Sequence, residues 1–168
     1  MSGSTSTRSA TIRLAGDADV DGVVSSVEQL LTELGGRRPP RSALEDEVRA
    51  ALEDPGVGVL FVAEAGGEIV ADADGEIVGV LSASWQRALH VPGRYATIQD
   101  LWVDAEWRSR QIGAALVEAL ADLCREQGVA RIEVGLPRES FAAIRATEAF
   151  YLGSDFEQLG PRMRRLLG

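Results

Sequence analysis

Two arginines, Arg108 and Arg110, stand in a polar segment that joins an apolar run to a long helical pattern. The first backbone amides of a helix have no partner within the helix, and together with the helix dipole they attract anions. Guanidinium groups beside those amides add charged hydrogen-bond donors that suit phosphate oxygens. These residue types and their spacing predict a diphosphate-binding loop. The alternative interpretation is an ordinary turn with two solvated arginines.

The segments around this loop have the patterns needed to position it. Tyr95–Val103 is largely apolar, which predicts a strand, and Asp104–Gln111 forms the polar loop. A helix is predicted from Ile112 to about Gln127, and Gly128 ends it. Its apolar stripe consists of Ile112, Leu116, Leu120 and Leu123.

Helix-start signals occur elsewhere in the chain as well. Asp17 or Asp19 caps a helix that ends before a Gly-Gly pair. Ser42 and Glu45 have the spacing of a capping box, which predicts the start of a second helix. A further helix is predicted over Phe141–Tyr151.

One short sequence is repeated, because Gly67–Val70 and Gly75–Val78 both read Gly-Glu-Ile-Val. A shift of eight residues keeps each side chain on the same side of a sheet, so the two copies compete for one strand register. We expect the second copy to be the core strand, continuing through Trp85. Further strands are predicted over Thr11–Leu14, Val57–Glu64, Arg131–Leu136, Phe156–Leu159 and Arg162–Leu167.

The elements follow the order β-α-α-β-β-β-α-β-α-β-β, which predicts an α/β (α+β) fold with a mixed sheet and helices on its faces. A chain of 168 residues fits one domain. We expect this domain over residues 11–168, preceded by a flexible Ser/Thr-rich tail of residues 1–10.

The composition opposes several classes of function. The chain has 17 basic and 26 acidic residues and a net charge of −9, which opposes nucleic-acid binding. Cys124 and His90 are the only residues of their types, which rules out an intrachain disulfide and cysteine-rich or multi-histidine metal sites. No apolar run approaches the ~20 residues that cross a bilayer. We therefore expect a cytoplasmic protein without a metal or a membrane partner.

The residues Ile98–Gly113 resemble the central motif of the GNAT superfamily of N-acetyltransferases. That motif is an apolar strand, a short acidic-aromatic turn and [Gln/Arg]-x-x-Gly-x-[Gly/Ala] at the start of a long helix. Phe150–Tyr151 followed by Phe156 resembles the family's Phe-Tyr-x-x-x-Gly-Phe signature, with Asp155 in place of the glycine. The resemblance extends from about Thr11 to the C-terminus. It implies a mostly antiparallel sheet of six to seven strands, flanked by about four helices.

By resemblance, acetyl-CoA is the cosubstrate, its diphosphate binds the loop, and its pantetheine pairs with the preceding strand, where an amide polarises the thioester carbonyl. Read from Arg108, the motif has Ser109 and Gln111 where glycine is more common, and glycine at the second position lets backbone approach the diphosphate closely. Gln111 still donates its N–H if its conformation is helical. The implied binding residues are Leu101, Trp102, Val103, Arg108, Ser109, Arg110, Gln111, Ile112, Gly113 and Ala114.

The resemblance makes Tyr151 the general acid that protonates the departing thiolate. The acceptor amine must attack unprotonated, and an alkylamine with a pKa near ~10.4 needs a proton acceptor at neutral pH. Family members with a strand glutamate carry it at positions matching Thr97 or Gln99, and neither residue is acidic here. Strict alternation puts Asp100 on the opposite face from these two. The base is therefore Asp100 through a bulge, Glu133 on the neighbouring strand, or a water chain.

Two functions remain open on this basis. The first is an enzyme that transfers acetyl from acetyl-CoA to a primary amine of a small molecule or peptide, by direct attack in a ternary complex. The second is a CoA-binding or ligand-sensing GNAT-fold module with little catalysis, which Gln111 and the missing strand glutamate motivate. The resemblance also suggests a homodimer.

Overall fold

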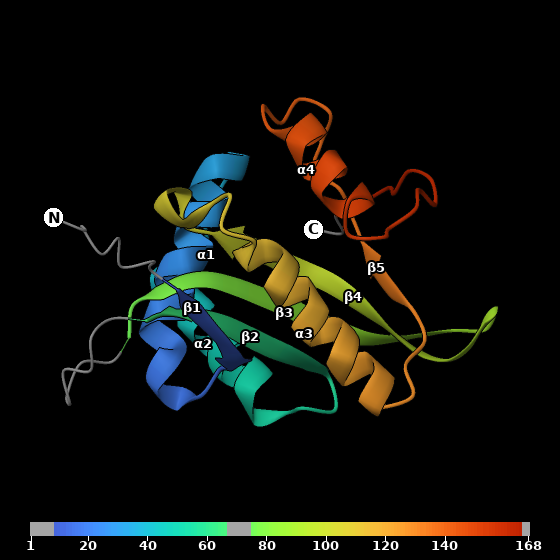
Figure 1. The fold of residues 1–168 in the computed structure, drawn as a ribbon, viewed down its shortest axis with the longest axis horizontal. Helices are drawn as coiled ribbons and strands as arrows, with labels where there is room; N and C mark the ends of the chain where they lie inside the picture. Colours follow the sequence, from blue (N-terminus) through green and yellow to red (C-terminus); the bar gives the residue numbers. More distant parts are fainter. Residues whose placement is uncertain (1–8, 67–74, 166–168) are drawn as a thin grey trace, which may run out of the picture.

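Five strands form one sheet in the computed structural model, which describes residues 9–66 and 75–165. They are β1 (Ala10–Leu14), β2 (Gly58–Ala65), β3 (Ile77–Ala88), β4 (Val91–Val103) and β5 (Ile132–Val134). The first four pair antiparallel in chain order, and β5 pairs parallel with β4 at one edge (Figure 1). A parallel pair needs a crossover, which the helix α3 (Ile112–Glu126) provides.

Helices cover both faces of the sheet because its strands alternate between two apolar sides. In β2, Leu60 and Val62 belong to the core formed with α1 (Val20–Leu34) and α2 (Arg41–Glu53). Their neighbours Phe61 and Ala63 belong to the core formed with α3. We call these two sides the α1 face and the α3 face. The last helix, α4 (Ile144–Leu152), adds Tyr151 to the core of the α3 face.

The predicted fold class and the predicted element order up to the fourth helix are confirmed. The number of strands differs, since the described residues form five strands instead of six to seven. The predicted strands Phe156–Leu159 and Arg162–Leu167 are irregular up to residue 165, and residues 166–167 lie outside the described part. Gly160 has a φ of 118° and precedes a proline, which cannot donate to a ladder. Leu159 and Met163 are exposed, so the described part of this segment beyond Phe156 buries no apolar face.

Two helix starts differ from the prediction because the carboxylates of Asp19 and Glu45 have other partners. Ser42 and Glu45 form no capping box, since α2 begins at Arg41 and its guanidinium lies 3.5 Å from the Glu45 carboxylate. Asp19 stands at the N-cap of α1 without capping it. Its carboxylate instead accepts hydrogen bonds from the Arg13 guanidinium at 2.7 and 2.8 Å.

Several other boundaries shift by a few residues, among them the start of β4, which is Val91 instead of Tyr95. The strand β1 begins at Ala10, the last residue of the segment predicted as a flexible tail, and residues 1–8 lie outside the described part. The helix α4 begins at Ile144, after a turn in which the Phe141 N–H donates to the Arg138 carbonyl at 2.9 Å. None of the described helices has both the length and the apolar character that crossing a bilayer requires.

The second copy of the repeated segment is the core strand, as predicted. Ile77 begins β3 and Val78, which follows it, is 1% exposed. The first copy, residues 67–70, lies outside the described residues. The strand then continues through Trp85 to Ala88, which gives β3 twelve residues and makes it a long partner for β4.

The two copies differ in the residue that follows them, which is Gly79 after the second copy and Ala71 after the first. A Cβ atom at Gly79 would lie 3.1 Å from side-chain atoms of Ala63 and Ile112 and 3.2 Å from Leu116. The helix α3 therefore packs against β3 at a spacing that leaves no room for a methyl group. This close approach favours the second copy, and it brings the start of α3 onto the sheet.

Gly79→Ala is expected to lower the free energy of unfolding by about 1–3 kcal/mol, because the added methyl group overpacks the contact between β3 and α3. Urea denaturation measures this change. The matched control is Gly16→Ala, where a Cβ meets nothing within 4 Å and the backbone is extended, with a φ of −133°. Equal stabilities of the two variants would contradict the tight packing at Gly79.

Candidate active site

A β-bulge in β4 sets the geometry of the site. Asp100 pairs with Ser82, and the register then shifts by one residue at Gln99, which has no partner of its own on β3. The Ser82 hydroxyl donates to Asp100 Oδ2 at 2.6 Å, and Gln99 Nε2 donates to Ser84 Oγ at 2.7 Å. Ser82 and Ser84 are two residues apart and share one face of β3. Asp100 and Gln99 therefore lie on the same face.

The bulge corrects the expectation from strict alternation, which put Asp100 opposite Thr97 and Gln99. Thr97 pairs directly with Ser84 and is 4% exposed, so its side chain also lies on this face. The face is the α1 face, since Val80, two residues before Ser82, belongs to the core under α1. Asp100 therefore reaches the face of Thr97 through a bulge.

The other candidate base, Glu133, shares this face. It pairs with Thr97 across the parallel ladder between β4 and β5, and paired residues in a ladder point to the same side. The Glu133 carboxylate lies 2.7 Å from the Arg131 guanidinium, so its charge is balanced by an ion pair. We call this group of side chains the polar floor: Ser82, Ser84, Thr97, Gln99, Asp100 and Glu133.

One edge of β4 is open beside the bulge, because β5 pairs only with residues 96–98. The Asp104 N–H donates to a β3 carbonyl at 2.9 Å, so the trans peptide directs the Val103 carbonyl away from β3. Because backbone groups alternate along a strand, the N–H and C=O of Leu101 also point away from β3, whereas those of Trp102 point toward it. Leu101 and Val103 thus present N–H and C=O groups along an edge that suits an extended chain with amide groups.

The loop before α3 keeps the backbone conformation that glycine would adopt. Ser109 and Gln111 stand where the motif more often has glycine, and both are left-handed, with φ of 64° and 62°. Gln111 is thus the left-handed N-cap of α3 rather than helical, and its side chain makes no capping hydrogen bond. The first N–H groups of α3 therefore receive no cap from this side chain and are available to donate to an anion. They belong to Ile112, Gly113 and Ala114.

The two arginines of the loop have different neighbours. The Arg110 guanidinium lies over the Trp107 ring, 5.2 Å from its centroid. Arg108 Nε donates to the Val103 carbonyl at 3.0 Å, and Arg108 Nη2 donates to Glu33 Oε1 at 2.5 Å. Both side chains are exposed beside the start of α3.

Gln111→Gly is expected to raise the free energy of unfolding by about 0.5–1 kcal/mol. A left-handed residue with a Cβ is strained by roughly 1–2 kcal/mol, and the greater freedom of glycine in the unfolded chain offsets part of the gain. Chemical denaturation measures the difference. Gln111→Ala is the matched control because it keeps the Cβ and the strain, and equal stabilities of the glycine and alanine variants would show that the strain is absent.

Tyr151 lies at the C-terminal end of α4 with its ring buried. It is 7% exposed, and it meets the rings of Phe150 and Phe156 edge to face, at centroid distances of 5.0 and 5.3 Å. Burial raises the pKa of its phenol to about 12, so the hydroxyl keeps its proton at neutral pH. Asp155, with a φ of 63°, replaces the glycine of the signature and keeps a left-handed turn after the helix.

Phe150 links the end of α4 to the start of α3. It packs against the core of the α3 face. A Cβ added to Gly113 would lie 3.2 Å from Phe150 Cε2 and 3.8 Å from Val103 Cγ2. The first turn of α3, the end of β4 and the residue before Tyr151 therefore meet at one point.

The sequence matches the model of the acetyltransferase (GNAT) family over residues 28–151, which is more than half of the chain. This chain belongs to the acetyltransferase (GNAT) family. The match runs from α1 to Tyr151 and includes the bulge, the open edge of β4 and the loop before α3. Members of the GNAT family use acetyl-CoA. Comparison with curated proteins gave no sequence match.

Solved GNAT-like structures share this fold at low sequence identity. A protein described as a possible acetyltransferase, from Clostridium difficile 630, has a TM-score of 0.75 at 19% identity, over 95% of this chain and 97% of its own. Glucosamine-6-phosphate N-acetyltransferase from Arabidopsis thaliana has a TM-score of 0.71 at 18% identity, over 95% and 99%. An aminoglycoside N-acetyltransferase in complex with CoA has a TM-score of 0.75 at 14% identity, over 97% of each chain.

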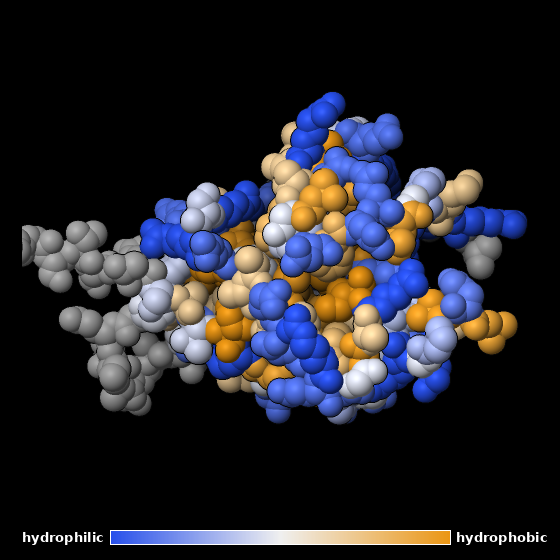
Figure 2. Space-filling view, turned by 45° about the vertical axis from the view of Figure 1, so that its right-hand side comes forward, coloured by the Kyte–Doolittle hydropathy of each residue, from blue (hydrophilic) through white to orange (hydrophobic). Residues whose placement is uncertain are grey.

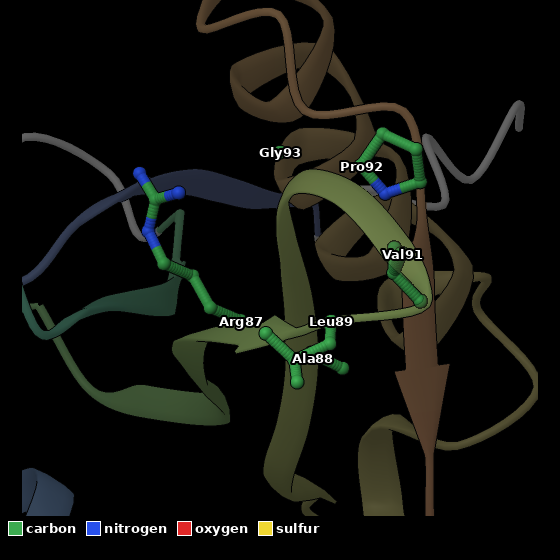
Figure 3. A pocket seen from close by; sticks show the side chains of 6 residues that line it. All are labelled: Arg87, Ala88, Leu89, Val91, Pro92 and Gly93. Carbon is green, nitrogen blue, oxygen red and sulfur yellow. The ribbon is translucent and has the colours of Figure 1, made fainter.

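The turn between β3 and β4 of this GNAT chain forms a separate, shallow pocket (Figure 3). His90 lies in this turn and is exposed, and Leu89 is fully exposed. Arg87 brings the one charged side chain of the lining, and it extends away from Val91 and Pro92. The lining has no carboxylate and no nucleophile, so it offers no chemistry. It consists of Arg87, Ala88, Leu89, Val91, Pro92 and Gly93.

The remaining residues singled out in the sequence, Trp85, Trp102 and Cys124, are each held by burial or by a hydrogen bond. The Trp85 indole donates to the Pro55 carbonyl at 3.0 Å, and Trp102 is 8% exposed. Cys124 is buried, which raises the pKa of its thiol and disfavours a reactive thiolate. Within the described ranges, no three His, Cys, Asp or Glu side chains gather as metal ligands. On the face drawn in Figure 2, hydrophobic residues lie among hydrophilic ones.

Three residues near the site were not predicted from the sequence. Ser82 and Ser84 supply the β3 side of the polar floor, and their alternation within an apolar strand was a usable signal. Glu33 contacts Arg108 across 75 positions of sequence. No local pattern indicates a contact at that separation.

Proposed function

We propose that this GNAT chain transfers the acetyl group of acetyl-CoA to a primary amine of a small molecule or peptide, by direct attack in a ternary complex. The bulge in β4 carries this proposal, because it leaves backbone groups of Leu101 and Val103 on an open edge and Asp100 on the adjoining polar floor. Two structural neighbours named for glucosamine-6-phosphate and aminoglycoside acetylation support an amine acceptor.

The residues of the loop and the open edge fit acetyl-CoA. The first amides of α3, assisted by Arg108 and Arg110, suit a diphosphate. Leu101 and Val103 offer the strand edge to the amides of the pantetheine, and Trp102 packs on the α1 face behind them. The cosubstrate supplies the acetyl group as a reactive thioester. In this proposal the binding residues are Leu101, Trp102, Val103, Arg108, Ser109, Arg110, Gln111, Ile112, Gly113 and Ala114.

The acceptor requires a base, and we assign this role to Asp100. An ammonium group with a pKa near ~10.4 is held by a carboxylate and loses its proton to that carboxylate, directly or through water. The Ser82 hydroxyl, at 2.6 Å, orients Asp100. Glu133 is paired with Arg131, so Asp100 is the better acceptor on the polar floor.

Tyr151 is assigned the second proton transfer. As the new bond to nitrogen forms and the bond to sulfur breaks, the leaving sulfur needs a proton, which the phenol donates. Burial keeps this phenol protonated at neutral pH because it raises its pKa to about 12. The acid and the base are thus separate residues that lie on opposite sides of β4, Tyr151 on the α3 face and Asp100 on the α1 face.

Two measurements test the proposal in sequence. Acetyl-CoA is expected to raise the melting temperature, because a ligand at a hundredfold excess over its Kd adds about 2.7 kcal/mol to the stability of the folded state. A panel of amino sugars, polyamines and peptide N-termini is then assayed for release of free thiol. Stabilisation without thiol release would favour the CoA-binding module. No stabilisation at millimolar acetyl-CoA would contradict both functions.

A further inference from the structure

The end of α1 contacts the loop that precedes α3. Glu33 lies in the last turn of α1, and its Oε1 accepts a hydrogen bond from Arg108 Nη2 at 2.5 Å. The same oxygen accepts the indole N–H of Trp102 at 3.3 Å. In Figure 1 this end of α1 lies beside the loop. One carboxylate thus joins α1 to both the loop and β4.

The same Arg108 side chain occupies part of the open edge of β4. Its Nε donates to the Val103 carbonyl at 3.0 Å, and this carbonyl faces away from β3. The Val103 carbonyl is one of the groups to which the pantetheine is assigned. While Arg108 is bound to Glu33, its guanidinium therefore closes the end of the edge nearest the loop.

We propose that Glu33 is a positioning residue that holds Arg108 across this edge until a cofactor diphosphate replaces the carboxylate. The inference rests on the proposed binding of acetyl-CoA at the loop. A carboxylate and a diphosphate oxygen are alternative anions for one guanidinium. The side chains of Arg108 and Glu33 are 47% and 38% exposed, so the exchange leaves no charge buried without a partner. Release of Arg108 frees the Val103 carbonyl for the pantetheine.

Glu33→Gln is expected to tighten the binding of CoA about threefold to fivefold, the size expected when an exposed ion pair no longer competes. Isothermal titration calorimetry with CoA measures this affinity. Glu28→Gln is the matched control. It also removes a carboxylate from α1, but Glu28 pairs with Arg41 at 2.6 Å. This control is expected to bind CoA like the wild type.

An Arg108→Gln background tests whether Glu33 acts through Arg108. There, Glu33→Gln is expected to change the affinity for CoA little or not at all. In the wild-type background, which retains Arg108, Glu33→Gln is expected to lower the KM for acetyl-CoA, with kcat and the KM for the acceptor unchanged. Urea denaturation establishes that each variant is folded.

The outcomes distinguish this inference from the proposed function. An equal gain in both backgrounds indicates repulsion between Glu33 and the diphosphate and overturns the proposal. Unchanged or weaker CoA binding by Glu33→Gln, when the wild type binds CoA, overturns only the role of Glu33. A wild-type protein that does not bind CoA overturns the proposed function, and the role of Glu33 with it.

Discussion

Tyr151→Phe is expected to lower kcat by about 10²- to 10⁴-fold, the usual contribution of a general acid, and to leave the affinity for CoA nearly unchanged. The phenylalanine ring keeps the edge-to-face contacts with Phe150 and Phe156, so the substitution removes the proton donor without opening a cavity. Steady-state kinetics and calorimetry with CoA measure the two effects separately.

The matched control for Tyr151→Phe is Tyr95→Phe, which removes the hydroxyl of the other tyrosine in the chain. It is expected to keep kcat. Retention of full turnover by Tyr151→Phe would remove Tyr151 from the mechanism. Equal losses in both variants would indicate a general effect of losing a hydroxyl rather than a role in proton transfer.

The same tyrosine has a consequence for the dependence on pH. Its folded-state pKa of about 12 is raised above the usual value of about 10, so the unfolded chain releases the phenol proton first. The contribution of Tyr151 to stability is therefore fully present below about pH 10 and is lost as the pH rises toward 12. Loss of kcat from ionisation of Tyr151 is expected in the same alkaline range and not near neutral pH.

Asp100→Asn is expected to lower kcat/KM for the acceptor about 10²-fold, because the amide keeps the shape of the side chain but cannot accept a proton. Glu133→Gln is the matched comparison on the same polar floor. Its effect is expected to be smaller, since Glu133 is already paired with Arg131. Rates with a series of amines of different pKa measure the proton transfer.

The comparison of these two variants decides among the three bases that the sequence leaves open. A larger loss in Glu133→Gln would reassign the base to β5. Small and equal losses would indicate a water chain. Ser82→Ala, which removes the 2.6 Å hydrogen bond to Asp100 and keeps the carboxylate, is expected to have an effect between that of Asp100→Asn and the wild type.

Local patterns predicted most of the fold, because helical periodicity and apolar runs are local properties. The helix α3 starts at Ile112, as its stripe predicted, and the second copy of the repeat forms β3. The two predicted C-terminal strands do not form in the described residues, because a strand needs a partner and a buried face as well as a suitable sequence. Leu159 and Met163 have no such face in the described residues.

The site was predictable only where its motif is local. The loop from Arg108 to Gln111 could be recognised from residue types, and its left-handed residues match the glycine positions of the motif. The face on which Asp100 lies depends on how β4 is registered against β3, which is a property of two strands. The contact between Glu33 and Arg108 joins distant segments, so no pattern within either segment encodes it.

The bulge at Gln99 shifts the alternation of β4 by one residue. After the bulge, the position of each residue along the strand determines whether its backbone groups face β3 or the open edge, and whether its side chain faces the polar floor. A change of residue type between Ile98 and Val103 alters one group, whereas the loss or gain of one residue exchanges all of them. The length of this short segment is therefore under a stricter constraint than its composition.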